Sequence, residues 1–257
     1  MVEHGTILTN ENVGQDIWRM EISAPEIATL AVPGQFVNVR LHDRVEPLLR
    51  RPISLHGIDS ESGTIAFLYL VVGKGTEMMT KMEPGKDINL LGPLGRGFSL
   101  DFEGERAVVI GGGIGSAPLY PLVRALRAKG KEVTLILGAR SKESIVALNL
   151  YKDIGATCKI ATEDGSLGVK GFVTAVLEEE LKSGSCDYLY TCGPIPMLRA
   201  IETMAAQYGV KGEISTEAHM GCGLGLCLSC SVRGRDGRNR KVCQAGPVFR
   251  LGELSYD

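Results

Sequence analysis

Apolar and polar residues alternate in short segments through the first hundred positions, and turn residues such as Pro33-Gly34 and Pro84-Gly85 separate these segments. A period of two residues predicts β-strands that bury one face, and the 3.6-residue period of helices is almost absent here. We expect strands at residues 17–22, 36–41, 52–56 and 65–72, and one short helix at residues 77–82. Such regular spacing predicts a small antiparallel β-barrel, which we assign to residues 1–100.

The pattern changes after Glu105, where continuous apolar segments alternate with amphipathic ones. We expect strands at residues 106–110, 132–137, 157–161 and 188–191, and helices at residues 117–129, 171–182 and 196–208. In the last helix, the helical period predicts one buried face that consists of Met197, Ile201, Met204, Ala205 and Tyr208. Alternating strands and helices predict a parallel sheet covered on both faces, so residues 101–213 are expected to form an α/β domain.

The remaining residues, 214–257, are rich in glycine and cysteine and show little periodicity. The predicted fold class is therefore a multidomain β plus α/β protein with a cysteine-rich subdomain at its carboxyl end. Hydrophobic residues make up 44 % of the 257 residues, which excludes a disordered chain. Lys and Arg number 28 against 30 Asp and Glu, a net charge of −2. This balance argues against nucleic acid and against an anionic membrane surface as partners.

Two features of the sequence bear on its location in the cell. Residues 1–10 lack a positive cluster followed by an apolar stretch, so no signal peptide is predicted. Glycines and prolines interrupt the most apolar stretch, residues 107–123, so no membrane span is predicted. We therefore expect a cytoplasmic protein.

Four of the seven cysteines lie close together near the carboxyl end, at Cys222, Cys227, Cys230 and Cys243. Their C-x4-C-x2-C…C order is the spacing with which plant-type ferredoxins bind a [2Fe–2S] cluster. Glycines at alternate positions of the loop leave room for the chain to wrap tightly around such a cluster. A structural zinc site is the alternative, but four-cysteine zinc sites favour two C-x2-C pairs. We therefore predict that these cysteines are iron ligands.

A glycine-rich turn follows the first strand of the α/β region, with Gly111, Gly112, Gly113 and Gly115. Between a buried strand and a helix, such a turn directs backbone N–H groups and the helix dipole toward a pyrophosphate. The match to G-x-G-x-x-G is imperfect, so the dinucleotide site is predicted from the context as well as the motif. Further candidates follow the strand at residues 188–191, at the sheet edge where a nicotinamide would lie: Cys192, Gly193 and Pro194.

The strand ends leave the choice between NAD and NADP open. An acidic residue at the end of the second strand would bind a ribose hydroxyl, and the sequence has Arg140 there instead. An arginine at this place suits a 2′-phosphate.

The barrel region carries a second candidate phosphate site. Arg51, Pro52, Ile53 and Ser54 place a guanidinium group and a hydroxyl group three residues apart on one strand. The planar guanidinium matches the oxygens of a pyrophosphate. Gly75 and Thr76 open the expected short helix, whose amino end is also receptive to phosphate.

In this order, these segments resemble those of the ferredoxin reductase-like flavoproteins. The likeness extends over almost the whole chain, through residues 33–36, 51–54, 73–76, 111–118 and 192–197. The tail is more specific, since residues 217–230 and 241–249 resemble the electron-transfer subunits of NAD-linked dihydroorotate dehydrogenases. Ala245 departs from that family, which commonly has an acidic residue before the Gly-Pro pair.

The resemblance implies FAD on the barrel, NAD on the α/β domain and a [2Fe–2S] cluster at the carboxyl end. It assigns FAD to the Arg51–Ser54 segment with Gly75 and Thr76, and it adds three residues of the next strand: Leu68, Tyr69 and Leu70. The implied function is electron transfer in pyrimidine biosynthesis, from an FMN-containing catalytic subunit through the cluster and FAD to NAD+. The implied assembly is a heterotetramer of two catalytic and two electron-transfer subunits.

The sequence suggests no site for an organic substrate, so no catalytic residue is predicted and the dihydroorotate chemistry is assigned to the partner subunit. One alternative keeps the cofactors and changes the partner to a hydrogenase, a sulfide dehydrogenase or a ferredoxin:NADP oxidoreductase. Another alternative is a zinc-bound, nucleotide-responsive regulator without electron transfer.

Overall fold

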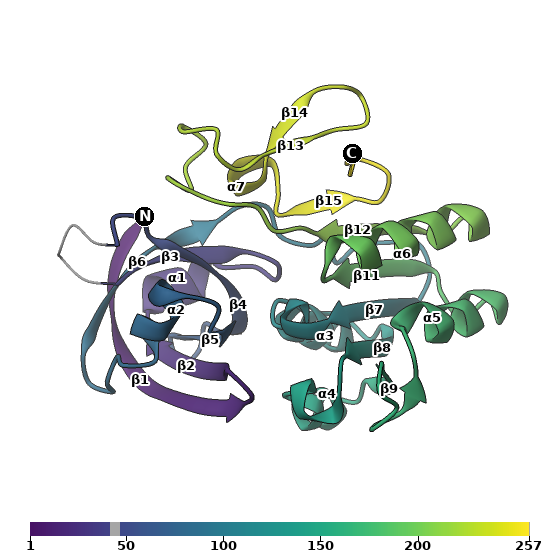
Figure 1. The fold of residues 1–257 in the computed structure, drawn as a ribbon, viewed down its shortest axis with the longest axis horizontal. Coiled ribbons are helices and arrows are strands. Elements are labelled where there is room, and N and C mark those ends of the chain that lie inside the picture. The colour runs from purple at the N-terminus through teal and green to yellow at the C-terminus, as the bar shows by residue number, and fades with distance from the viewer. Residues whose placement is uncertain (42–46, 257) are drawn as a thin grey trace.

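The computed structural model describes residues 1–41 and 47–256, which form a barrel, an α/β domain beside it, and a carboxyl-terminal region that lies over both (Figure 1). Within these residues, six antiparallel strands close the barrel in the order β1-β2-β5-β4-β3-β6. The strands are β1 (Val2–Gly14), β2 (Ile17–Ser23), β3 (Phe36–Arg40), β4 (Arg51–Asp59), β5 (Thr64–Leu70) and β6 (Asp87–Leu94). The predicted barrel is confirmed, as are its four expected strands.

The sequence analysis missed two of the barrel strands, β1 and β6, and the short helix α1 (Pro25–Leu30). The first strand was hidden because one of its inward positions is the acidic Glu3, which breaks the apolar alternation. The carboxylate of Glu3 accepts hydrogen bonds from the backbone N–H groups of Glu26 (3.1 Å) and Ile27 (2.7 Å) at the start of α1. Burial of this charge is therefore compensated by a helix amino end, a tertiary contact that the local pattern does not contain.

The expected short helix is α2 (Lys74–Met79), which begins and ends three residues earlier than predicted. Its start is fixed by Thr76, whose hydroxyl oxygen accepts hydrogen bonds from the backbone N–H groups of Val72 (2.9 Å) and Gly73 (3.3 Å).

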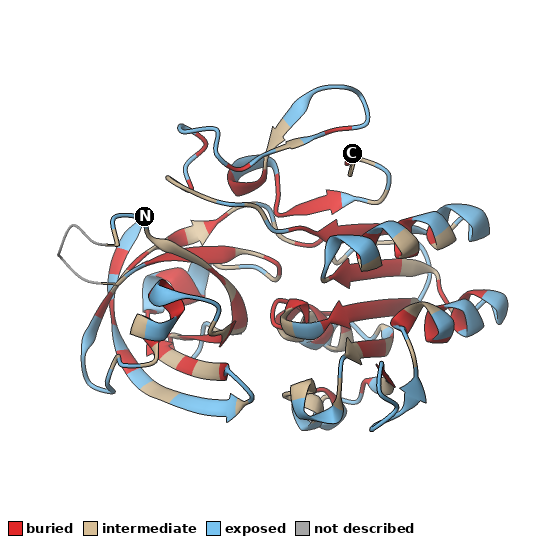
Figure 2. Ribbon diagram, in the orientation of Figure 1, coloured by how far each residue is buried: buried red, intermediate tan, exposed pale blue. Residues whose placement is uncertain are grey.

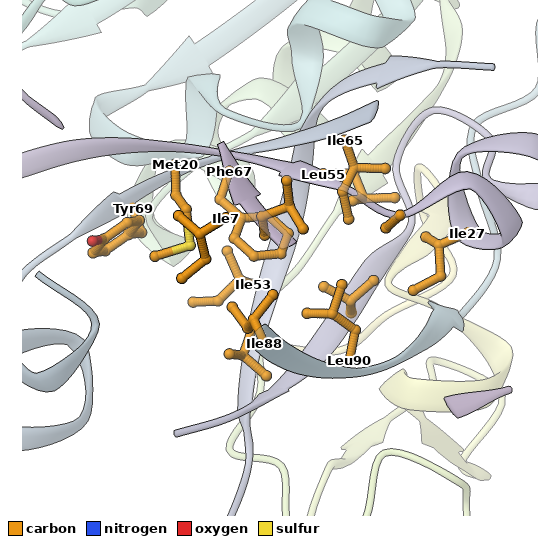
Figure 3. Close-up of a cluster of buried hydrophobic side chains, with 14 of the residues drawn as sticks. Ile7, Met20, Ile27, Ile53, Leu55, Ile65, Phe67, Tyr69, Ile88 and Leu90 are labelled. Carbon is orange, nitrogen blue, oxygen red and sulfur yellow. The ribbon is translucent and has the colours of Figure 1, made fainter. Parts of the chain in front are cut away.

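The inward side chains of the barrel strands form a closed apolar core. Figure 3 shows Ile7, Met20, Leu55, Phe67 and Leu90 converging from five different strands. Because every second residue of each strand points inward, the alternate residues are left to face outward, toward the rest of the molecule. Residues of β3, β4 and β5 form the barrel wall of one candidate cavity.

The α/β domain contains a seven-stranded sheet in the order β10-β9-β8-β7-β11-β12-β15 within the described residues. Its strands are β7 (Arg106–Gly112), β8 (Glu132–Ala139), β9 (Thr157–Thr162), β10 (Val169–Lys170), β11 (Tyr188–Cys192), β12 (Lys211–Ser215) and β15 (Val248–Arg250). The expected parallel arrangement is confirmed for β7–β12, whereas β15 pairs antiparallel with β12. The strand order reverses at β7, and α/β sheets bind ligands at the carboxyl ends of strands at such a point.

The helices of this domain are α3 (Leu119–Ala128), α4 (Leu148–Asp153), α5 (Val173–Lys182) and α6 (Ile195–Tyr208), with short 3₁₀ turns η1 (Gly113–Ser116) and η2 (Lys142–Ser144). α3 begins two residues later than predicted because η1 occupies the turn before it. The predicted face of α6 is partly wrong, since Leu198 and Glu202 are buried and Tyr208 is 39 % exposed. Glu202 is buried because its carboxylate accepts hydrogen bonds from Arg235 and from the backbone N–H of Gly252, at 2.5 Å each.

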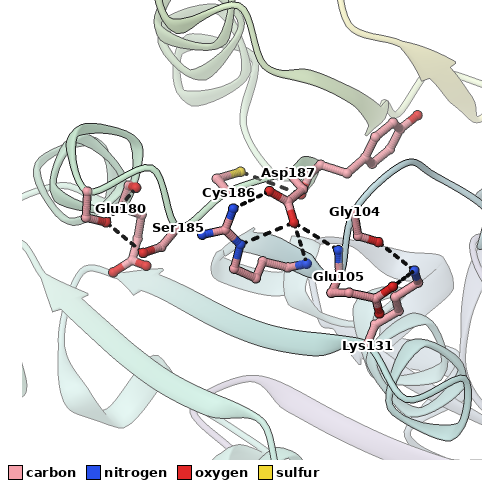
Figure 4. Close-up of polar contacts among 10 residues, drawn as sticks. Gly104, Glu105, Lys131, Glu180, Ser185, Cys186 and Asp187 are labelled. Atoms are coloured by element: carbon pink, nitrogen blue, oxygen red, sulfur yellow. Dashed lines mark hydrogen bonds and ion pairs between the residues drawn. The ribbon is translucent and has the colours of Figure 1, made fainter.

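At the amino ends of β7 and β11, a partly exposed ion pair between Arg106 and Asp187 fixes the two strands side by side (Figure 4). The carboxylate of Asp187 accepts hydrogen bonds from the backbone N–H groups of Glu105 and Arg106, both at 2.9 Å, and from the Arg106 guanidinium at 2.5 Å. These contacts, above all the Arg106 side chain, hold the pKa of Asp187 far below its usual range. The opposite, carboxyl-terminal edge of the sheet is left for ligands.

The carboxyl-terminal region contains the hairpin β13 (Ser231–Arg233) and β14 (Asn239–Lys241) and the short helix α7 (Val242–Ala245). Its apolar core joins all three parts of the molecule, since Phe36 and Leu94 of the barrel pack with Ile214 of the sheet and with Val242 and Cys243. Figure 2 shows this buried zone continuing from the barrel strands into the central sheet, while the outer faces of α5 and α6 are exposed. Among the described residues, none of the helices is long and apolar enough to cross a membrane.

Candidate cofactor and electron-transfer sites

A cavity of about 300 Å³ lies between the barrel and the carboxyl-terminal edge of the sheet. Its barrel wall contains eight of the residues that the sequence analysis assigned to FAD: Arg51, Pro52, Ile53, Ser54, Leu68, Tyr69, Leu70 and Thr76. The opposite wall contains Cys192 together with residues that the sequence analysis did not assign to a cofactor: Ile114, Ala117, Pro118, Ser215, Thr216, Glu217, Ala218, Met220 and Pro247. Most of them belong to the glycine-rich turn and to the cysteine-rich tail, two segments that only the folded chain brings to this cavity.

Gly75, the remaining residue assigned to FAD, lies directly against the side chain of Arg51. A β-carbon at Gly75 would be 2.0 Å from Nε of Arg51. The guanidinium therefore crosses the amino end of α2 so closely that only glycine fits there without a shift of the Arg51 side chain. The Arg51 guanidinium also donates a 2.6 Å hydrogen bond to the carbonyl oxygen of Leu49. A fixed cation and the N–H groups at this end of the cavity form a receptive place for a pyrophosphate.

Cys192 lies on the far wall of the same cavity, at the end of β11 and directly opposite Gly111 in the sheet register. Burial, together with the negative charge of Glu217, raises the pKa of its thiol to about 12, so the thiol is protonated at neutral pH. The cavity therefore has a neutral sulfur and a carboxylate on the side of the α/β domain.

His56, which the sequence analysis did not assign to a site, joins the barrel to the start of α3. Its Nδ1–H donates a 2.9 Å hydrogen bond to the carbonyl oxygen of Ala117, and its ring lies 5.4 Å from the ring of Tyr120. Burial lowers the pKa of His56 to about 4, so the imidazole is neutral at physiological pH. Because Ala117 lines the cavity, this bond helps to set the distance between its two walls.

A second cavity, of about 480 Å³, opens at the carboxyl ends of β7, β8 and β9. It is lined by Gly112, Gly113 and Pro194 from the predicted nucleotide residues, while Gly111, Gly115 and Gly193 lie behind them. A β-carbon at Gly115 would lie 2.7 Å from the carbonyl oxygen of Cys192, so the glycine turn packs directly on the Cys192–Pro194 turn. The structure thus brings the two predicted turns together at one sheet edge.

Arg140 and Glu163 face the same cavity from neighbouring strand ends. The residue after the second strand of the α/β domain is Arg140, and the acidic residue of this cavity follows the third strand, β9. Parallel strands align their carboxyl ends, so Glu163 was recognisable only once the β8–β9 pairing was known. A carboxylate here is the group that binds ribose hydroxyls in dinucleotide sites.

The cysteine loop is organised by hydrogen bonds from backbone N–H groups to sulfur. Sγ of Cys222 accepts from the N–H groups of Leu224 (3.3 Å), Leu226 (3.4 Å) and Cys227 (3.4 Å). Sγ of Cys243 accepts from the N–H of Gly225 at 3.1 Å, which joins the loop to α7. N–H groups directed at thiolate sulfur are a recurrent feature of iron–sulfur sites, so the loop fits a cluster.

The thiols of the loop differ in their environments. Hydrogen bonds from the Ser229 hydroxyl and from the backbone N–H groups of Cys222 and Ser229 lower the pKa of the exposed Cys227 to about 6. Burial raises the pKa of Cys243 to about 11. Within residues 1–41 and 47–256, no three His, Cys, Asp or Glu side chains converge at the spacing of a single metal ion. A [2Fe–2S] cluster distributes its four thiolates over two irons, a wider spacing than that of one ion.

The cysteine loop continues directly from the wall of the first cavity. Met220 lines that cavity, and Cys222 follows it by two residues. Phe36 also lines the cavity and belongs to the apolar core that contains Cys230 and Cys243. The two candidate redox sites therefore share a wall.

Comparison with known proteins shows which family this arrangement belongs to. Residues 217–255 match the iron-sulfur cluster binding domain of dihydroorotate dehydrogenase B, and residues 109–203 match the oxidoreductase NAD-binding domain. The chain is 46 % identical to the dihydroorotate dehydrogenase B (NAD(+)) electron transfer subunit of Desulforamulus reducens over 95 % of both chains. It is 41 % identical to that of a Geobacillus species over 98 % of both. The chain belongs to this family of electron transfer subunits.

A solved structure shares the fold of this family member along nearly its whole length. It is the structure of an NADH-dependent reduced ferredoxin-NADP oxidoreductase, which is 30 % identical and superposes with a TM-score of 0.88. The match covers 98 % of this chain and 90 % of that one. Family membership confirms the resemblance seen in the sequence, together with an iron–sulfur domain, an NAD-binding domain and electron transfer.

Proposed function

We propose that this electron transfer subunit holds FAD in the 300 Å³ cavity, NAD in the 480 Å³ cavity, and a [2Fe–2S] cluster on Cys222, Cys227, Cys230 and Cys243. Its role in pyrimidine biosynthesis is to carry electrons from an FMN-containing catalytic subunit, through the cluster and FAD, to NAD+. When bound, a flavin exchanges a hydride with nicotinamide and single electrons with an iron–sulfur centre. The shared wall formed by Phe36 and Met220 is the observation that best supports this route.

The residues of the cavities have distinct tasks in this proposal. Arg51 and the N–H groups at the amino end of α2 hold the flavin pyrophosphate. Ser54 on the barrel and Cys192 on the sheet line the cavity and would help to hold the flavin there, and the protonated Cys192 thiol would add no charge. The cysteine loop provides thiolates and N–H groups, which together hold the cluster and offset its negative charge.

Glu163 supports NAD as the nucleotide. Its carboxylate lines the cavity and would accept hydrogen bonds from the ribose hydroxyls of NAD, whereas its charge would repel the 2′-phosphate of NADP. Arg140, which the sequence left as an argument for NADP, faces the same cavity, and its positive charge would oppose the effect of Glu163 on a 2′-phosphate.

Three leucines on the cysteine loop mark the surface that receives the catalytic subunit. Leu224, Leu226 and Leu228 are all exposed, with Leu226 reaching 79 %. They lie on either side of the exposed Cys227 in the sequence, so an apolar contact here would bring the partner close to the cluster and exclude water from the interface. We propose that two catalytic and two electron-transfer subunits associate through this surface.

A related complex that acts on ferredoxin and NADP is the second candidate, because the ferredoxin-NADP oxidoreductase above shares the fold over 98 % of the chain. The higher identity to the dihydroorotate dehydrogenase subunits, 46 %, favours the first candidate. Copurification of the partner from cells separates the two.

An absorption spectrum of the anaerobically purified protein, before and after NADH, tests the proposal. We expect flavin bands and broad cluster absorption that NADH bleaches, with iron and inorganic sulfide in equal amounts. The isolated subunit should oxidise NADH with artificial acceptors and leave dihydroorotate untouched. A colourless protein that contains zinc, or turnover of dihydroorotate by this chain alone, would contradict the proposal.

A further inference from the structure

Asn38 is a buried amide that uses none of its side-chain hydrogen-bonding capacity within the described residues. It is 1 % exposed, and both Nδ2 and Oδ1 are without a partner. Buried polar side chains are almost always hydrogen-bonded, because an amide that leaves water without a partner destabilises the fold. A buried amide without a partner in the protein therefore indicates that a bound cofactor or ligand provides the hydrogen-bond partner.

The barrel fixes the direction of this side chain. Its neighbours Val37 and Val39 belong to the barrel core, so Asn38 points to the outer face of β3. Its backbone is held by a 3.2 Å hydrogen bond from the Arg50 guanidinium to the Asn38 carbonyl oxygen. Pro52 lies directly opposite on β4 and lines the proposed flavin cavity. Asn38 is therefore next to that cavity but outside it.

The group on the other side of Asn38 is the cysteine loop. A β-carbon at Gly223 would lie 2.1 Å from Nδ2 of Asn38, and Gly223 has a φ of +70°, in the left-handed region that favours glycine. Gly223 immediately follows Cys222 in the cysteine loop, and Gly223 and Gly225 are both buried residues of that loop. The amide thus reaches the loop between the first two predicted iron ligands.

We propose that the Asn38 amide donates an N–H hydrogen bond to a sulfur of the [2Fe–2S] cluster and thereby raises the reduction potential of the cluster. The inference rests on the cluster of the proposed function and adds a positioning and tuning residue from the barrel. Donors to sulfur stabilise the reduced, more negative state of such a centre. A residue of β3, the strand whose Phe36 lines the proposed flavin cavity, would then help to set the reduction potential of the cluster.

The test compares Asn38→Leu, which keeps the volume and removes both N–H donors, with Thr191→Val as a matched control. Thr191 is fully buried and its hydroxyl also has no partner in the part of the chain that the structure describes, but it lies inside the sheet on β11. A redox titration of the purified protein, followed by electron paramagnetic resonance, measures the potential. For Asn38→Leu we expect a reduced-to-oxidised ratio about tenfold lower at a fixed potential, equivalent to about 59 mV for one electron. Thr191→Val should titrate like the wild type.

Thermal unfolding of the cluster-loaded and cluster-free forms gives an independent readout. If the amide bonds the cluster, Asn38→Leu should stabilise the cluster-free form and destabilise the loaded form. If the amide is only a buried packing group, both forms should become more stable, and that result would overturn the inference, as would an unchanged potential.

Two further outcomes are decisive. If Asn38→Leu does not fold, Asn38→Ala takes its place in both measurements. Loss of flavin from both variants would show that Asn38 only supports the packing of the barrel, and would refute the inference. Wild-type protein without iron and sulfide would refute the proposed function itself, whereas an unshifted potential in an iron-loaded variant refutes the role of Asn38 alone.

Discussion

The guanidinium of Arg51 lies against the backbone of Gly75, where a β-carbon would come within 2.0 Å of Nε. A strand of the barrel and the amino end of α2 are thereby brought to one end of the cavity that we assign to FAD. The two segments were separate candidates in the sequence, and this contact joins them at the place where we propose that the phosphates of FAD bind.

Gly75→Ala should therefore weaken FAD binding without unfolding the protein, because the flexible guanidinium can move away from the added methyl group. Loss of a charge-assisted contact of about 1.5–3 kcal/mol corresponds to roughly tenfold to 100-fold weaker binding. Gly73→Ala is the matched control, since that glycine has open space around it and an extended backbone with a φ of 174°. Fluorescence titration of flavin-free protein measures both affinities, and equal affinities would exclude a role for this contact.

Cys227→Ser should remove most of the cluster and leave the flavin in place. The residue is exposed, so the change costs little packing, and its sulfur is one of the four predicted ligands. Iron and sulfide analysis together with the broad visible absorption measures the loss. Cys158→Ser, a half-buried thiol on β9, should keep the full iron content. Full iron content in Cys227→Ser would remove that residue from the ligand set.

Glu163→Gln should shift nucleotide preference toward NADPH. Removal of the negative charge lowers the repulsion of a 2′-phosphate, and a change of about 1.4 kcal/mol corresponds to a tenfold shift in the ratio of kcat/KM for NADPH to that for NADH. Glu61→Gln removes the same charge from an exposed turn of the barrel and should leave the ratio unchanged. Steady-state kinetics with an artificial acceptor measures the ratios, and an unaltered ratio in Glu163→Gln would place nucleotide selection elsewhere.

Leu226→Glu should weaken association with the catalytic subunit at least tenfold, because it places a charge in an apolar contact. NADH oxidation with artificial acceptors should persist, since this side chain lines neither cavity. Leu30→Glu, which changes an exposed leucine at the end of α1, is the control. Titration calorimetry with the catalytic subunit measures both, and equal affinities would exclude the leucine surface as the interface.

Stability should fall as the pH drops from about 6.5 to about 4, and His56 should cause part of the fall. Its pKa is lowered to about 4 by burial, so the unfolded state binds a proton in this window while the folded state does not. Between pH 6.5 and pH 4, protonation of His56 in the unfolded state lowers the free energy of unfolding by about 3 kcal/mol, and above pH 6.5 this loss is absent. Urea unfolding at several pH values measures the free energy of unfolding, which should fall less steeply with decreasing pH in His56→Gln than in the wild type. An equal pH dependence in the two proteins would mean that His56 does not contribute.

Local patterns in the sequence determined a large part of this protein. The cysteine spacing, the glycine turn after β7 and the Arg51–Ser54 strand were each readable because their chemistry lies within a few consecutive residues. The strand and helix periods likewise predicted the barrel and the parallel sheet, because the side chains of one element face its own core.

Only the tertiary structure decided which distant groups meet. Glu3 hid β1 because a helix amino end stabilises its buried charge, and Glu163 entered the nucleotide cavity because neighbouring strands end together. Asn38 is an ordinary strand residue until the loop at Gly223 covers it, about 185 positions later in the chain. The energy of a polar side chain depends on its partners, and residues far apart in sequence become partners only when the chain has folded.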